Sequence, residues 1–207
     1  MAEVRWAEES GKLPACGCIL AGGQSRRMGT NKALLPFHGE PLIQRVARRL
    51  QAWLDQVVVV TNDPETYAFL GLPMVGDREP GAGPLGGIEA GLRASRHRVA
   101  FVVACDMPFL HPGLVAHLVT LAQEADAVVP VVAGQYEPTC AVYTRDCLPA
   151  VAELLAAGER RIARLFKRVR IREVGEEEIR SFGPPERLFF NCNTPEDYRL
   201  ALAMEGA

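Results

Sequence analysis

Short apolar runs alternate with helical patterns along most of the chain. Runs that are almost entirely apolar are typical of strands covered on both faces, and shorter apolar patterns predict further strands. The expected strands lie at residues 16–20, 56–60, 72–75, 99–105, 127–132, 138–143 and 169–174. Between them, apolar residues spaced three or four apart predict helices. These are expected at residues 41–54, 83–95, 112–124, 145–156, 160–167 and 195–204.

This alternation of strands and helices predicts the fold class. It implies right-handed crossovers and a sheet with helices on both faces. We therefore expect an α/β, three-layer, Rossmann-like fold with a mostly parallel central sheet. Residues 182–186, which include two prolines, are expected to form a loop. With 207 residues in the chain, residues 16–207 are expected to form a single domain. Residues 1–15 contain three acids and no apolar stretch, so we interpret them as a flexible extension and not as a signal peptide.

Composition narrows the classes of function. The net charge is −2 at pH 7, so no general basic surface for nucleic acid is expected. No run approaches the ~18 apolar residues that a membrane span needs. The six cysteines form no C-x-x-C pair, and free thiols predict a reducing compartment, the cytoplasm. The four histidines show no metal-ligand or triad spacing and are expected at the surface or in caps.

Charged and glycine-rich segments follow the predicted strands. In open α/β sheets, ligands bind beyond the carboxyl ends of the strands, so these segments should share one edge. They are residues 21–29 (AGGQSRRMG), 61–63 (TND), 76–87 (GDREPGAGPLGG) and 105–108 (CDMP). The sequence therefore predicts a charged rim along one edge of an apolar sheet.

The segment LAGGQSRRMGTNK, residues 20–32, is suited to a polyphosphate. Its glycines let backbone N–H groups point at phosphate oxygens, and Arg26, Arg27 and Lys32 add positive charge. It lacks both G-x-x-x-x-G-K-[ST] and G-x-G-x-x-G, which argues against a P-loop enzyme and a dinucleotide oxidoreductase. A loop whose arginines are only solvated is the alternative interpretation.

Asp106 follows an apolar run and is therefore expected at the same rim. A carboxylate that faces a phosphate loop is a natural Mg²⁺ ligand, whereas a turn aspartate before Pro108 is the alternative. The chain carries no G-x-S-x-G motif and no context for a cysteine nucleophile. Its chemistry therefore fits direct transfer at phosphorus, in which positioning and charge neutralisation do most of the catalysis.

Four asparagines lie near the predicted rim. In NCNTPEDY, residues 191–198, Thr194 is expected to cap a helix, which leaves Asn191 and Asn193 free to bind a ligand or help hold a metal. The same roles, ligand binding or help in holding a metal, are open to Asn31 and Asn62, which lie nearer the predicted phosphate loop. The alternative for all four is an ordinary turn asparagine.

Four motifs resemble those of the molybdenum cofactor guanylyltransferases (MobA), members of the nucleotidyltransferase superfamily. LAGGQSRRMGTNKALL, GPLGGIEAGL, CDMPFL and FFNCNTPEDY occur in the family's order between residues 17 and 202. The resemblance implies a fold of the nucleotide-diphospho-sugar transferase type. It also implies that GMP passes from GTP to the terminal phosphate of molybdenum-molybdopterin, forming molybdopterin guanine dinucleotide and pyrophosphate. Other molybdenum cofactor biosynthesis proteins and recipient molybdoenzymes are implied partners, whereas nucleic acid and membrane are not.

The resemblance also implies roles for individual residues. GTP binding falls to Leu20, Ala21, Gly22, Gly23, Lys32, Asn62, Asp77 and Asp106. Arg27, Lys32 and Asp106 would act in catalysis, with Asp106 as the Mg²⁺ ligand. Arg161, Asn191 and Asn193 would lie on the acceptor side. Asn31 stands where the family commonly has aspartate.

Two other functions remain open from the sequence. The first is a cytidylyltransferase or sugar-phosphate nucleotidyltransferase on the same fold. The second is a non-catalytic nucleotide-binding module, against which the presence of Lys32 and Asp106 argues.

Overall fold

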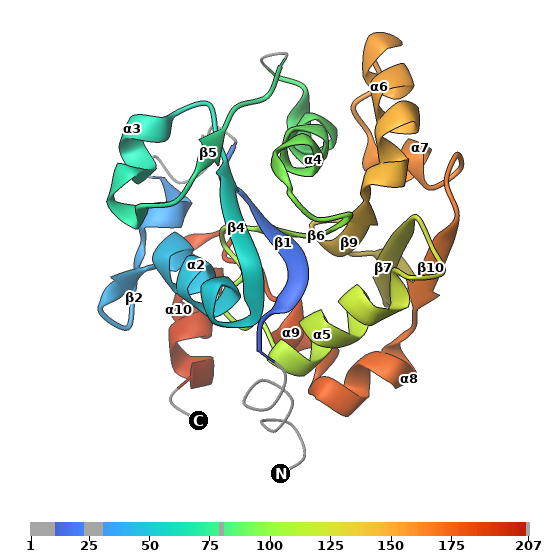
Figure 1. Ribbon diagram of the computed structural model, residues 1–207. Coiled ribbons are helices and arrows are strands. Elements are labelled where there is room, and N and C mark those ends of the chain that lie inside the picture. Colours follow the sequence, from blue (N-terminus) through green and yellow to red (C-terminus); the bar gives the residue numbers. More distant parts are fainter. Residues whose placement is uncertain (1–10, 23–30, 79–80, 206–207) are drawn as a thin grey trace.

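The computed structural model describes residues 11–22, 31–78 and 81–205 (Figure 1). Its central sheet follows a path of seven strands, with an eighth, β8 (Gln135–Tyr136), paired to β7. In spatial order the strands are β10 (Ile171–Val174), β7 (Ala127–Val132), β9 (Cys140–Thr144), β6 (Val99–Ala104), β1 (Leu13–Leu20), β4 (Leu54–Val60) and β5 (Met74–Val75). The expectation of a mostly parallel sheet is confirmed, because four of the six pairs along this path are parallel.

Strand direction determines which loops meet at the functional edge. The pairs β1–β4, β1–β6, β4–β5 and β7–β10 are parallel. Strand β9 is antiparallel to both of its neighbours, β6 and β7. The carboxyl ends of β1, β4, β5 and β6 thus share one edge, and the amino end of β9 reaches that same edge.

Each face of the sheet is covered by its own hydrophobic core. One core contains residues of α2 (Leu42–Trp53) and α5 (Pro112–Leu121), and the other contains residues of α4 (Gly83–Ala94), α6 (Leu148–Ala156) and α7 (Ile162–Leu165). Within β1, Ile19 belongs to the first core and Cys18 to the second. Successive side chains of a strand point to opposite faces, so a strand buried on both faces must be apolar throughout.

A close approach of α4 to β1 depends on Gly91. A Cβ added there would lie 2.8 Å from the Sγ atom of Cys18, which is inside the normal contact distance. Glycine is therefore the residue that lets this helix lie directly against the strand. The packing fixes the start of α4 above the end of β1, where the predicted nucleotide loop begins.

The remaining elements are short and lie around the sheet. They are η1 (Lys32–Leu34), β2 (Pro36–Phe37), β3 (Glu40–Pro41), α3 (Pro64–Tyr67), η2 (Ala68–Leu70), η3 (Arg145–Cys147), α8 (Glu176–Ile179), η4 (Arg180–Phe182), α9 (Pro185–Leu188) and α10 (Pro195–Glu205). A third, small core contains Phe37, Leu42, Phe109, Cys192 and Ala201, and it joins the β2–β3 hairpin to the carboxyl-terminal segment.

Several predicted boundaries differ from the structure. The prediction of a loop at residues 182–186 is wrong for its last two residues, because α9 begins at Pro185. Proline suits the first turn of a helix, where its missing N–H is not needed. The helix expected at residues 160–167 is reduced to Ile162–Leu165, and β1 begins at Leu13, three residues before its predicted start. Residues 1–10 of the predicted extension lie outside the described residues.

Candidate nucleotide-binding site

The loops after four strands meet at the sheet edge, as the sequence predicted. Three backbone hydrogen bonds between neighbouring strands extend past the strand ends. They run from Ala21 N to Val60 O (2.9 Å), from Thr61 N to Val75 O (2.8 Å) and from Cys105 N to Leu20 O (3.2 Å). These bonds place the segments that follow β1, β4, β5 and β6 side by side.

Lys32 and Asp106 lie close together at this edge. Burial raises the pKa of the Asp106 carboxyl, and the nearby positive charge of Lys32 partly opposes that shift. The Nζ atom of Lys32 also donates a hydrogen bond to Oδ1 of Asn193, 3.0 Å away. The fold therefore joins an ammonium group, a carboxylate and an amide that are far apart in the sequence.

The carboxyl-terminal segment is hydrogen-bonded directly to the Asp106 loop. Cys192 N donates to the carbonyl of Asp106 over 3.0 Å. The Asp197 carboxylate accepts from the backbone N–H groups of Asn193 and Thr194, and the Thr194 hydroxyl accepts from Asp197 N. This reciprocal capping holds Asn193 beside Lys32. Asn191 uses its side-chain NH₂ within its own turn, donating to the carbonyl of Phe189 at 2.9 Å.

Helix α2 holds the segment that follows Asp106. Arg45 is 6% exposed and donates to the carbonyl of Pro108, and Arg49 donates to the carbonyl of Leu110. Burial, together with neighbouring arginines, lowers the pKa of Arg49 to about 10. The two guanidinium groups, one buried and one half-buried, thus donate to backbone carbonyls of this segment. The position of the Asp106 loop is thereby tied to the α2 layer.

The structure also brings together Asn62 and Asp77, both predicted to contact the nucleotide. Oδ1 of Asn62 accepts a hydrogen bond from the backbone N–H of Asp77 at 2.9 Å. Burial raises the pKa of the Asp77 carboxyl, and the hydrogen bond from Asn62 opposes the shift. A Cβ on the intervening Gly76 would lie 2.7 Å from the same Oδ1 atom. Glycine at this position therefore makes the link between the two loops possible.

Asn31 has a local structural role next to Lys32. Its Oδ1 accepts from Ala33 N at 3.1 Å, which caps η1, and its Nδ2 donates to the Tyr67 hydroxyl at 2.9 Å. Both ends of the amide are thus used within the protein. The Asn31 amide therefore attaches the Lys32 turn to α3.

The other predicted site residues fall into three groups. Leu20, Ala21 and Gly22 lie at the end of β1, on the shared edge. Gly23 and Arg27 lie outside the described residues. Arg161 is exposed and bound by Glu159 at 2.9 Å, and no described contact links it to Lys32, Asp106 or Asn193.

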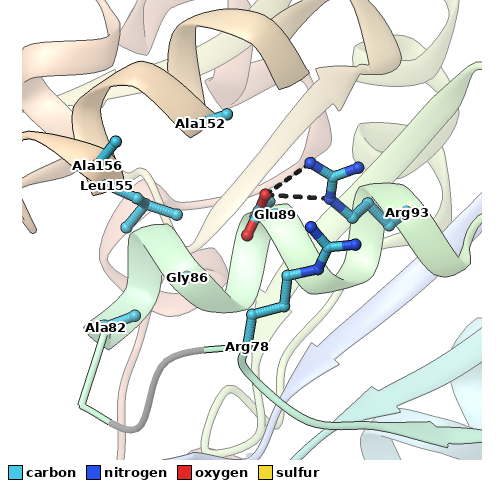
Figure 2. Close-up of a pocket in the computed structure, with 8 residues that line it drawn as sticks. All are labelled: Arg78, Ala82, Gly86, Glu89, Arg93, Ala152, Leu155 and Ala156. Atoms are coloured by element: carbon cyan, nitrogen blue, oxygen red, sulfur yellow. Dashed lines mark hydrogen bonds and ion pairs between the residues drawn. The ribbon is translucent and has the colours of Figure 1, made fainter.

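A separate hollow of about 220 Å³ lies between α4 and α6 (Figure 2). Glu89 is 6% exposed, and its Oε1 accepts two hydrogen bonds from Arg93, at 3.0 and 2.8 Å. Arg78 and small apolar side chains complete the lining. None of the lining residues was predicted as a site residue.

The fold and this edge define a nucleotidyltransferase, and comparison with known proteins identifies the family. The MobA-like NTP transferase domain matches residues 17–174. A probable molybdenum cofactor guanylyltransferase of Pelotomaculum thermopropionicum is 40% identical over 93% of this chain and 94% of its own length. The chain therefore belongs to the MobA-like NTP transferase family.

Solved structures agree with this assignment. Molybdopterin-guanine dinucleotide biosynthesis protein A from Archaeoglobus fulgidus superposes with a TM-score of 0.81 and 28% identity, covering 92% of this chain and 98% of that protein. A 2-C-methyl-D-erythritol 4-phosphate cytidylyltransferase from Thermus thermophilus has a TM-score of 0.69 and 22% identity, over 94% of this chain and 100% of that protein. The second similarity supports the shared fold alone. Among the described residues, no helix is both long and apolar enough to span a membrane.

Proposed function

We propose that the protein transfers GMP from GTP to the terminal phosphate of molybdenum-molybdopterin. The products are molybdopterin guanine dinucleotide and pyrophosphate. The observation that carries the proposal is the convergence of Lys32, Asp106 and Asn193 beside the strand ends. Relatives named molybdenum cofactor guanylyltransferase match this chain over almost its whole length. Their name supports GTP as the donor and the molybdenum cofactor as the acceptor.

The order of the strands supports a division of the site into two halves. Asn62 and Asp77 follow β4 and β5, whereas Asn191 and Asn193 belong to the segment bonded to the loop after β6. GTP would bind on the β4–β5 side through Leu20, Ala21, Gly22, Asn62 and Asp77, with Gly23 in the same loop. The acceptor would bind on the β6 side. Lys32 and Asp106 would lie where the acceptor half meets the nucleotide half, so that the phosphates of the two substrates come together beside them.

The residues at this edge fit Mg²⁺ carried by the nucleotide. Mg²⁺ takes one or two protein carboxylates and fills its other positions with water and phosphate oxygens. Asp106 supplies one desolvated carboxylate, and in the described part of the chain no cluster of three or more His, Cys, Asp or Glu residues could form an all-protein metal site. When bound, Mg²⁺ would neutralise phosphate charge.

The chain's own residues would then position the reactants. An oxygen of the acceptor phosphate attacks the α-phosphorus, a new P–O bond forms, and the bond to the β-phosphate breaks to release pyrophosphate. No general base is required, because a phosphate monoester is already ionised near neutral pH. Lys32, together with Arg27, would stabilise the charge that develops on the transferred phosphoryl group. Arg161 is a weaker candidate for the acceptor phosphate, since Glu159 already binds its guanidinium.

The test is an assay of pyrophosphate release with GTP, Mg²⁺ and molybdenum-molybdopterin. Transfer is expected with all three and should be lost in Asp106→Ala. Calorimetric titration of GTP and CTP separates this function from a cytidylyltransferase of the same fold, because a clear preference for CTP would reject the proposal. GTP binding without pyrophosphate release, with active acceptor present, would instead favour a non-catalytic module.

The proposed reaction also bears on location and partners. Molybdopterin is handed over from other biosynthesis proteins, and its dinucleotide form is delivered to recipient molybdoenzymes. We place this exchange in the cytoplasm, where the six free cysteines remain reduced.

A further inference from the structure

Glu137 is an acid at the functional edge to which no role has yet been given. Its backbone is fixed, because Glu137 N donates to the carbonyl of Pro130 at 2.9 Å and its own carbonyl accepts from Cys140 N at 3.1 Å. Two residues further on, the carbonyl of Thr139 accepts from Ala104 N at 2.9 Å. Ala104 ends β6, two residues before Asp106. The antiparallel direction of β9 thus brings Glu137 to the edge at which Asp106 lies.

The carboxylate of Glu137 lies on the face of the carboxyl-terminal segment. Tyr136 lies on the opposite face, with its ring 4.9 Å from that of Phe166 in the α4–α6 core and its hydroxyl bonded to Glu173. The next side chain of an extended backbone points the other way. In agreement, the charge of Glu137 helps to raise the pKa of Cys140, which packs in the other core with Phe189.

Glu137 is half-buried, and its carboxylate has no partner among the described residues. Burial raises the pKa of its carboxyl, and within the described parts of the chain no hydrogen-bond donor or cation contacts it. Several carboxylates elsewhere, among them Glu40 and Asp126, are paired with arginines. A desolvated carboxylate without a partner costs stability unless something else supplies hydrogen bonds. A ligand with N–H donors would supply them.

The strand order indicates which of the two substrates, the nucleotide or the acceptor, would lie beside Glu137. Asn62 and Asp77 lie on the β4–β5 side, and β1 and β6 separate β4 from β9, a span of about 14 Å at normal strand spacing. Asp106 lies after β6, between these two ends. Glu137 is therefore on the side opposite the nucleotide pair, where the acceptor would extend away from the reacting phosphate.

We propose that Glu137 is a specificity-determining residue that holds the 2-amino-4-oxopyrimidine edge of a pterin acceptor. This edge presents two adjacent N–H donors, which match the two oxygens of a carboxylate as a guanidinium group does. The inference rests on the proposed function, since it assumes that the acceptor carries a pterin.

A pair of pteridines tests this recognition without the transfer reaction. The probes are 6-hydroxymethylpterin phosphate and its lumazine counterpart, in which oxygen replaces the 2-amino group. Binding to the full chain is measured by pteridine fluorescence. The wild type should bind the pterin at least about tenfold more tightly, because a site built for a donor rejects an analogue that lacks it. In Glu137→Ala the two affinities should agree within about twofold. In Glu137→Gln the preference for pterin should be lost or reversed, because the amide can accept from N3–H and donate to the 2-oxo group of the lumazine.

Controls separate recognition from folding and from the reaction. Glu177→Gln, at an exposed position on α8, should keep the wild-type preference for pterin, and all variants should bind GTP with unchanged affinity. Equal binding of the two probes by the wild type, no binding of the pterin, or an unchanged preference in Glu137→Gln would each overturn the assignment. GMP transfer by the wild type is measured separately. A pterin preference that depends on Glu137, found without GMP transfer, would reject the proposed reaction and retain the recognition.

Discussion

The link between Asn62 and Asp77 can be broken without changing either residue. In Gly76→Ala, the new Cβ would lie 2.7 Å from Oδ1 of Asn62, whereas the next atom, the carbonyl oxygen of Thr61, would be 3.5 Å away. The Asn62 side chain is exposed, so it has room to rotate away from the new methyl group. The substitution should therefore displace this amide and leave the backbone in place.

The expected loss of GTP affinity follows from the bond that is broken. Displacing Asn62 removes its hydrogen bond from Asp77 N, and a bond of this kind contributes about 0.5–1.5 kcal/mol. If that link organises both residues for the nucleotide, the Kd for GTP should rise by about two- to tenfold. Gly76 is exposed, so the free energy of unfolding should fall by no more than the contribution of that bond, about 0.5–1.5 kcal/mol.

Calorimetry with GTP and Mg²⁺ measures the effect, and a double-mutant cycle tests its cause. In an Asn62→Ala background, Gly76→Ala should have no further effect, because the atom that clashes is gone. Gly175→Ala is the matched control, since a Cβ there meets nothing within 4 Å. The reasoning is refuted if Gly76→Ala binds GTP like the wild type, or if its full effect persists without the Asn62 amide.

Three further substitutions test the site and its support. Asp106→Asn should lower kcat by about 10²–10³-fold in a pyrophosphate-release assay. Its melting temperature should be equal or higher at neutral pH, because burial raises the Asp106 pKa and the charged form therefore destabilises the folded state above that pKa. Lys32→Ala should raise the KM for GTP in steady-state kinetics, and unchanged kinetics would contradict the phosphate role. Gly91→Ala should cost about 1–3 kcal/mol in urea unfolding by overpacking against Cys18. Relative to Cys18→Ala alone, the cost should be smaller but not zero, because the Cβ of residue 18 remains 3.0 Å from the new Cβ.

Much of the architecture follows from local patterns in the sequence. Continuous apolar runs such as β6 arise because Phe101 and Val103 pack in one core while Ala100 and Val102 pack in the other. Such runs predict buried strands whatever their neighbours are. The reversed direction of β9 is less visible in the sequence. It follows a tight β7–β8 turn at Ala133 and Gly134, both with positive φ, and the Ala-Gly pair is a weaker hairpin signal than Asn-Gly.

The site was predictable where motifs mark strand ends and not where tertiary contacts make it. Lys32 and Asp106 were placed at one edge because each follows a predicted strand of a parallel sheet. The hydrogen bond between Lys32 and Asn193 joins residues 161 positions apart, and no spacing rule gives it. The sequence alone leaves Asn31 as either a ligand-binding residue or a turn residue. Its hydrogen bond to the Tyr67 hydroxyl shows the structural role, and this contact joins residues that are distant in the sequence. Glu137 belongs to no recognisable motif, and only the antiparallel course of β9 reveals its position.

The acids of this edge differ from Glu40 and Asp126 in the direction of their pKa shifts and in their lack of arginine partners among the described residues. Burial raises the pKa of Asp77, Asp106 and Glu137, and none of the three forms an ion pair with an arginine in the described residues. By contrast, Glu40 and Asp126 have pKa values lowered by hydrogen bonds from arginines. Lys32 and Asn62 offset the cost of burial only in part at Asp106 and Asp77. Three desolvated acids along one rim therefore point to ligands that supply further hydrogen bonds or positive charge.

Ligand binding should then act on stability as well as on chemistry. A ligand that binds only the folded state stabilises it by about 2.7 kcal/mol at a concentration 100 times its Kd. For GTP with Mg²⁺, part of that gain should come from charge neutralisation at Asp106. Asp106→Asn should therefore narrow the difference in melting temperature between free and GTP-bound protein, even though the free variant is no less stable. If GTP raises the melting temperature equally in the wild type and in Asp106→Asn, the Asp106 carboxylate does not contribute to binding of the nucleotide and its metal.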